Sequence, residues 1–132
     1  MRIALVLDAS AVVSYANHGL SVGETIGEVN AEDGAFVAIP AVSLASAHLN
    51  VRGNNALVML RRLLEDEEYP VMLAPLLGED AATVAGMAAR LKDDLALAHA
   101  VVTAEHHTAQ LMTAHGRAVR AAVGDLHGIV DF

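Results

Sequence analysis

The chain has 132 residues, of which 55% are hydrophobic and 3% aromatic, so it can form one compact domain over residues 1–132 with a core of small and branched aliphatic side chains. It contains no cysteine, which excludes disulfides, thiolate chemistry and cysteine-based zinc sites. Sixteen Asp and Glu against eight Lys and Arg give a formal charge of −8, which repels polyanions at long range and argues against general nucleic-acid affinity.

The apolar runs of the chain are short, which is typical of buried strands in a layered α/β protein. The first run, Arg2 to Leu7, stops at Asp8. This run is too short for a transmembrane helix or for the apolar part of a signal peptide, so we expect a cytoplasmic protein without a membrane segment. Further strands are predicted at Ala35 to Ile39, Tyr69 to Pro75, Gln110 to Thr113 and Ile129 to Phe132.

Helices are predicted between most of these strands from apolar spacing and from residues that begin or end helices. They are Ala9 to about Ala16, Ser21 to about Asn30, Ala41 to Leu49, Ala56 to Leu64, Asp80 to Leu91 and Leu95 to His106. Ser21 and Glu24 form a capping-box pattern at the start of the second helix. The order β-α-α-β-α-α-β-α-α-β-β favours a three-layer α/β/α sandwich with a parallel sheet of about five strands.

The helix predicted from Leu95 to His106 is apolar on most of its circumference, so it should pack on more than one side. The strand that follows it should end at a site, because open α/β sheets bind ligands at the carboxyl ends of their strands. Two basic pairs, Arg61 with Arg62 and Arg117 with Arg120, are the candidates for a local basic patch. Solvated helix faces are the ordinary interpretation of such pairs.

The last predicted helix and its strand resemble a known pattern. Residues 95–113 read LALAHAVVTAEHHTAQLMT, which is similar to the end of a PIN domain, roughly L-A-D-A-x-x-A-x-A-x-x-x-x-A-x-L-V-T-x-D. This is the nuclease fold of the virulence-associated protein C (VapC) toxins. The stretch IPAVSLASAHL, residues 39–49, resembles the family's V-P-x-x-x-x-x-E-x, and Asp8-Ala9-Ser10 resembles its D-x-S opening. The resemblance implies a PIN-like fold and a metal site built from three or four acids.

Carried over position by position, the resemblance leaves one of the four acids in place. Asp8 corresponds to the metal-binding aspartate, and Ser10 to the hydroxyl residue that supports it. The substituted positions are Ser46 for a glutamate, Leu97 for an aspartate and His115 for the last acid, which follows the matching residue Thr113. One carboxylate competes weakly with water for magnesium, so such a site would be largely empty at ordinary metal concentrations.

Two functions remain open at this point. In the first, the chain is a PIN-like protein with impaired or absent nuclease activity that needs no cofactor and binds protein, as a homodimer and with an antitoxin-like partner. In the second, it is an active Mg- or Mn-dependent endoribonuclease toxin of a type II toxin–antitoxin pair, with RNA as substrate. Asp8 and Asp94 would then be catalytic, because Asp94 lies three residues before Leu97 and within about 60° of it on the helix.

The seven histidines suggest a third possibility, a transition-metal site. Asp8 with His115, and less naturally His99, would suit zinc or nickel better than magnesium. His99 is two residues beyond Leu97 and is expected to face away from Asp8. His106 and His107 end a helix, where a partly protonated imidazole complements the helix dipole.

Overall fold

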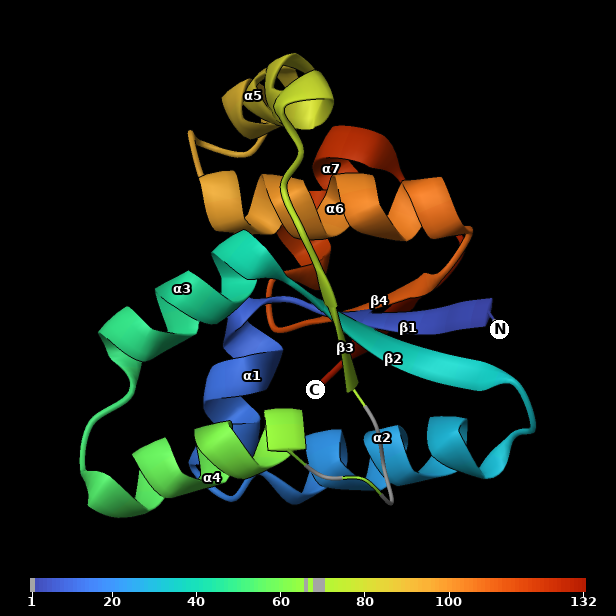
Figure 1. Cartoon of the computed structure of the whole chain (residues 1–132). Coiled ribbons are helices and arrows are strands. Elements are labelled where there is room, and N and C mark those ends of the chain that lie inside the picture. Colours follow the sequence, from blue (N-terminus) through green and yellow to red (C-terminus); the bar gives the residue numbers. More distant parts are fainter. Residues whose placement is uncertain (1, 66, 68–70) are drawn as a thin grey trace.

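The fold is seen in a computed structural model that describes residues 2–65, 67 and 71–132. Within these residues, five parallel strands form one sheet in the order β3-β2-β1-β4-β5 (Figure 1). The strands are β1 (Arg2–Leu7), β2 (Ala35–Pro40), β3 (Val71–Ala74), β4 (Gln110–Thr113) and β5 (Ile129–Asp131). This confirms the predicted parallel sheet. Tyr69 and Pro70, the start of the predicted third strand, lie outside the described residues.

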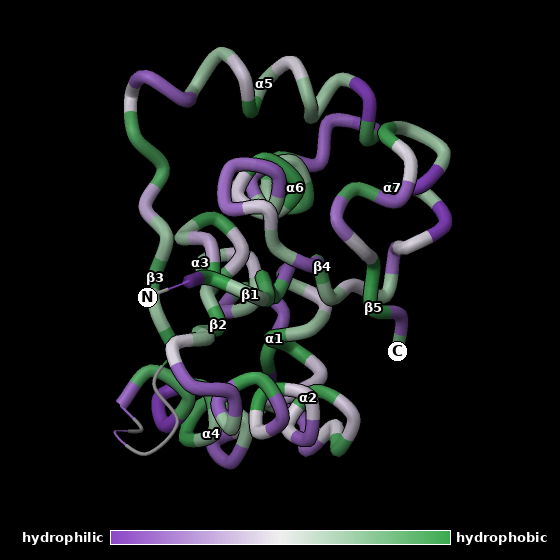
Figure 2. The backbone as a smooth tube through the Cα atoms, turned by 90° about the vertical axis from the view of Figure 1, so that its right-hand side faces the viewer, coloured by the Kyte–Doolittle hydropathy of each residue, from purple (hydrophilic) through white to green (hydrophobic). Residues whose placement is uncertain are grey.

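Helices cover both faces of the sheet (Figure 2). They are α1 (Ala9–Ala16), α2 (Leu20–Ala31), α3 (Ala41–Asn50), α4 (Asn54–Glu65), α5 (Ala81–Arg90), α6 (Leu95–His107) and α7 (Gly116–Val123), with a short 3₁₀ helix, η1, at Gly78–Asp80. Helices α1, α2 and α4 lie on one face, and α6 lies on the other with α5 on its outer side. The three-layer sandwich predicted from the sequence is therefore correct.

Each face of the sheet has its own hydrophobic core. Leu5 and Leu7 of β1 pack with α1, α2 and α4, whereas Val6 packs with α5 and α6. Ile3 belongs to the same core as Val6, although strict alternation would place it with Leu5. The register between β1 and β2 shifts between Ile3 and Leu5, and such an irregularity reverses the side on which the preceding residues point.

Helix α7 was not predicted. The predicted order ended in two consecutive strands, but β4 and β5 are parallel, and parallel neighbours need a crossover connection. Helix α7 supplies it. Its Arg120 bonds Asp125 at 2.9 Å and Asp131 of β5 at 2.6 Å, so one member of the predicted basic pair is neutralised by two acids.

The capping box predicted at Ser21 and Glu24 is wrong. Helix α2 begins one residue earlier, at Leu20, and no side chain caps it. The start of α2 is set instead by the turn after α1, where the Gly19 N–H donates to the Ser14 carbonyl at 2.7 Å. A Cβ at Gly19 would lie 2.7 Å from that carbonyl oxygen, so the turn can close this tightly only with glycine.

Candidate functional site

A hollow of about 360 Å³ lies at the carboxyl end of the sheet, beside the first residues of α1 and α6. Six of the residues singled out from the sequence line this hollow: Asp8, Ser10, Ser46, Asp94, Leu97 and His115. Thr113 lies behind them, fully buried, with its hydroxyl on the Asp8 carboxylate. The structure therefore brings the sequence-predicted positions together from four separate parts of the chain.

Asn50 also lines the hollow and was not predicted. Asn50 lies one helical turn after Ser46 on α3, and its side-chain amide donates to the Ser46 carbonyl at 2.8 Å. The i, i+4 spacing from Ser46 was the available signal, because residues four apart on a helix share a face. Asn50 adds a neutral amide to the hollow, not a charge.

Asp8 is held by hydrogen bonds to both of its carboxylate oxygens. Its Oδ1 accepts from the Ser10 hydroxyl at 2.6 Å and from the Ala11 N–H at 2.9 Å, which makes Asp8 the N-cap of α1. Its Oδ2 accepts from the Thr113 hydroxyl at 2.6 Å. The side chain is 1% exposed. Asp8 is thus a structural cap that also forms the floor of the hollow.

The two hydroxyls around Asp8 are themselves fixed by backbone groups. The Ser10 oxygen accepts from the Ala114 N–H at 2.9 Å, and the Thr113 oxygen accepts from the His115 N–H at 2.9 Å. These bonds join the end of β1 to the turn after β4. The role expected for Ser10, support of Asp8, agrees with this geometry.

Burial raises the pKa of the Asp8 carboxyl, because removal from water disfavours the charged form. Hydrogen bonds from Ser10, Thr113 and Ala11, and the nearby charge of His115, act in the opposite direction and are outweighed. The folded state therefore binds this proton more tightly than the unfolded chain does. Stability from this group is fully present below its ordinary pKa of 3.8 and is lost as the pH rises through the raised value.

We expect Asp8→Asn to raise the free energy of unfolding at neutral pH. Asparagine keeps Oδ1 as an acceptor for Ser10 and Ala11, its amide can donate to the Thr113 oxygen, and no buried charge remains. The gain should shrink as the pH falls through the raised pKa of Asp8, and it should be smallest below 3.8, where the aspartate of the parent protein is protonated in both the folded and the unfolded state. Urea denaturation of both proteins across this pH range measures it. A difference that does not change with pH would contradict the argument.

Asp94 lines the same hollow but is already used as a helix cap. It precedes α6 as the N-cap, and its Oδ1 accepts from the Leu97 N–H at 3.0 Å. Unlike Asp8, it is exposed. Asp94 is therefore a structural cap of α6 as well as a lining residue of the hollow.

Leu97 lines the hollow and also packs in the hydrophobic core. It is 6% exposed and belongs to the core that packs α5 and α6 against the sheet. A carboxylate at this position would be placed among aliphatic side chains, where an unpaired charge is costly. In this chain the position contributes packing.

The residues around the hollow do not fit a magnesium or manganese site. Octahedral magnesium is usually held by carboxylates, and here one buried carboxylate has hydrogen bonds on both oxygens while the other caps a helix. In the part of the chain that the structure describes, no three His, Cys, Asp or Glu side chains are grouped so that they could hold a metal ion.

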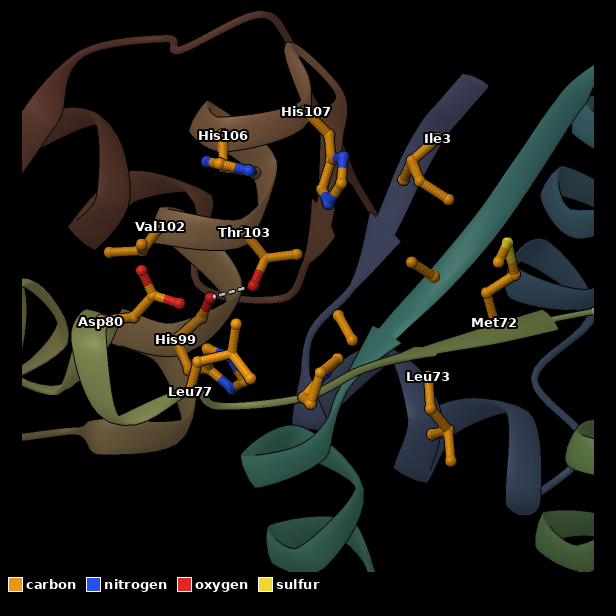
Figure 3. A pocket seen from close by; sticks show the side chains of 13 residues that line it. Ile3, Met72, Leu73, Leu77, Asp80, His99, Val102, Thr103, His106 and His107 are labelled. Atoms are coloured by element: carbon orange, nitrogen blue, oxygen red, sulfur yellow. Dashed lines mark hydrogen bonds between the residues drawn. The ribbon is translucent and has the colours of Figure 1, made fainter. Parts of the chain in front are cut away.

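His99 faces away from Asp8, as expected from its position on the helix. It lines a second hollow, of about 280 Å³, between α6 and the end of β3 (Figure 3). His106 and His107 line the same hollow, with ring centres 5.1 Å apart. Burial and the charge of His106 lower the pKa of His107, which opposes the partly protonated state expected there. His99 therefore lines a different hollow from Asp8 and His115.

Among the described residues, no helix is long and apolar enough to cross a membrane.

No known protein family's sequence profile matches the chain, and no curated protein is significantly similar in sequence. A solved structure described as "Structure of FitAB bound to IR36 DNA fragment" contains a similar chain, with a TM-score of 0.61 and 19% identity. The match covers 96% of this chain and 94% of that one. With its parallel sheet between two helical layers, the chain has a PIN-like α/β fold.

Proposed function

We propose that this protein is related to the VapC-type toxin ribonucleases, has impaired or no nuclease activity, and acts by binding another protein. Its partners would be a second copy of itself and an antitoxin-like protein, and it would work in the cytoplasm. The small number of acids is the observation that carries this proposal: Asp8 and Asp94 are the only Asp or Glu among the described residues that line the hollow. The only buried acid of the hollow is a structural group, and Leu97 fills the place of a second acid.

Exposed leucines beside the hollow support a protein-binding role. Leu49 is 73% exposed and Leu95 is 55% exposed, and each is next in sequence to a residue that lines the hollow, Asn50 or Asp94. A partner that covered these two side chains would remove apolar surface from water, which would favour its binding. Neither leucine is needed for the two cores described above.

The experiment that tests this proposal is a manganese titration followed by thermal unfolding. A site with a dissociation constant one hundredth of the metal concentration would stabilise the fold by about 2.7 kcal/mol. We expect no change in the melting temperature at millimolar manganese, because the donor set is incomplete. A saturable upward shift that Asp8→Asn abolishes would contradict the proposal. The same titration with zinc, repeated on His115→Ala, tests a transition-metal site.

The alternative is an active Mg- or Mn-dependent endoribonuclease, and one observation favours it: Asp8 and Asp94 line the same hollow. An activity assay on single-stranded RNA distinguishes the two functions. Cleavage that is lost in Asp8→Ala and in Asp94→Ala would establish the enzyme. Asp93→Asn is the matched control, because Asp93 is exposed, adjacent to Asp94 and not a lining residue, and asparagine tolerates its positive φ of 61°.

A further inference from the structure

A groove that is larger than either of the two hollows described above adjoins the hollow at Asp8. It has a volume of about 740 Å³ and is lined by residues of α5, the turn before α6, α6 and α7, which neighbour one another in Figure 2. Asp94, Leu97 and His115 line both spaces, so the two lie side by side. We call the larger space the basic groove, because of the side chains described next.

Three of the chain's eight basic side chains, Arg90, Lys92 and Arg117, line the basic groove. Lys92 and Arg117 form no hydrogen bond or ion pair within the described part of the chain. Arg90 donates to the Ala122 carbonyl of α7, a neutral group. Asp94 is the single acid among the lining residues, and it caps α6. A protein with a formal charge of −8 therefore carries a groove in which three basic side chains face one acid, so the groove is net positive.

The surface between these cations is aliphatic. Leu91 and Leu97 are buried beneath the groove, and α7 adds Ala118 and Ala121, which share a helix face. No Phe, Tyr or Trp is among the lining residues. Sequence-tolerant binding of single-stranded nucleic acid relies on aromatic platforms for the bases, and this groove offers one imidazole in their place. Aliphatic anchors flanked by carboxylates match the lining better than a phosphodiester chain does.

We propose that the basic groove binds a segment of a partner protein in which aliphatic side chains are flanked by Asp or Glu. This inference rests on the proposed function and specifies the charge of the partner. The cations attract the carboxylates, and the alanines of α7 let a backbone approach closely. Because Asp94, Leu97 and His115 line both spaces, the bound segment would also cover the entrance to the Asp8 hollow.

The test is a selection from a phage-displayed library of random dodecapeptides on the full-length protein. Peptides that bind Arg90→Gln/Lys92→Gln/Arg117→Gln are subtracted. We expect the remaining peptides to be acidic and aliphatic. By fluorescence anisotropy, the triple variant should bind them about tenfold more weakly, as the loss of three exposed ion pairs implies. The matched control is Arg52→Gln/Arg61→Gln/Arg62→Gln, which removes the same charge outside the groove and should bind like the parent protein.

The inference is overturned if no peptide is enriched, if the enriched peptides are basic or uncharged, or if both triple variants lose equal affinity. It is also overturned if a single-stranded RNA dodecamer binds the groove more tightly than the best peptide does. These outcomes differ from a failure of the proposed function, which would appear as manganese stabilisation and RNA cleavage whatever the peptides do. Melting curves of both triple variants establish that each is folded.

Discussion

Leu97→Asp is expected to lower the free energy of unfolding at neutral pH by about 3–5 kcal/mol, the usual cost of an uncompensated buried charge. Leu97 is 6% exposed and packs in the core between α6 and the sheet. The new carboxylate would face Asp8 across the same hollow, and like charges disfavour each other's ionisation. Urea denaturation at neutral pH measures the loss. The substitution would thus show how much a second acid beside Asp8 lowers the free energy of unfolding.

Leu97→Asn is the matched control for that experiment. It has nearly the same shape as aspartate and carries no charge, so it reports the cost of lost packing and of a buried amide alone. The two variants should differ at neutral pH and approach each other in acid, where the new carboxyl is protonated. Equal losses at all pH values would mean that charge is not the reason why leucine suits this position.

Thr113→Val is expected to cost about 1.5–3 kcal/mol at neutral pH, because it removes a hydrogen bond to a buried charged group. Valine keeps the shape of the side chain, but Asp8 Oδ2 loses the donor that lies 2.6 Å away. The pKa of Asp8, already raised by burial, should rise further without this bond. The loss should therefore be larger at neutral pH than in acid, as measured by urea denaturation.

The control for this substitution is Thr103→Val, at another buried threonine. Its hydroxyl donates to the His99 carbonyl at 2.7 Å, a neutral backbone group within the same helix. The cost should be smaller and independent of pH. Combining Thr113→Val with Asp8→Asn gives a second comparison, in which the pH dependence should disappear. If Thr103→Val and Thr113→Val cost the same at every pH, the hydroxyl of Thr113 does not stabilise a charge.

The sequence was enough to predict the parallel sheet. Short apolar runs identify parallel strands, and the carboxyl ends of parallel strands meet at one edge, which brings Asp8 after β1 beside Thr113 at the end of β4. Ser46 and Leu97 were chosen as candidate site residues because they align with acidic positions in the PIN-domain pattern. The hydrogen bonds that occupy both oxygens of Asp8 depend on side-chain orientation, which spacing along the chain does not specify.

Other features depend on contacts that are distant in sequence. The segment GRAVRAAV has only eight residues, so its apolar pattern did not distinguish a helix from a turn. The position of helix α7 depends on the parallel pairing of β5 with β4. The capping box failed because the tight Gly19 turn sets where α2 begins. The basic groove could not be predicted, because Arg90 and Lys92 come from one part of the chain and Arg117 from another, and they meet only after α5 and α7 pack beside α6.

The bonds from Ser10 and Thr113 to Asp8 have a consequence for recognition. They tie the turn after β4 to the first turn of α1 from both sides, so the base of the hollow has its geometry before any partner arrives. A rigid base spares an incoming segment the entropic penalty of ordering that part of the receptor. The affinity would then depend mainly on the conformational entropy that the partner segment loses on binding. A segment that is already ordered in its bound conformation would bind more tightly than a flexible one.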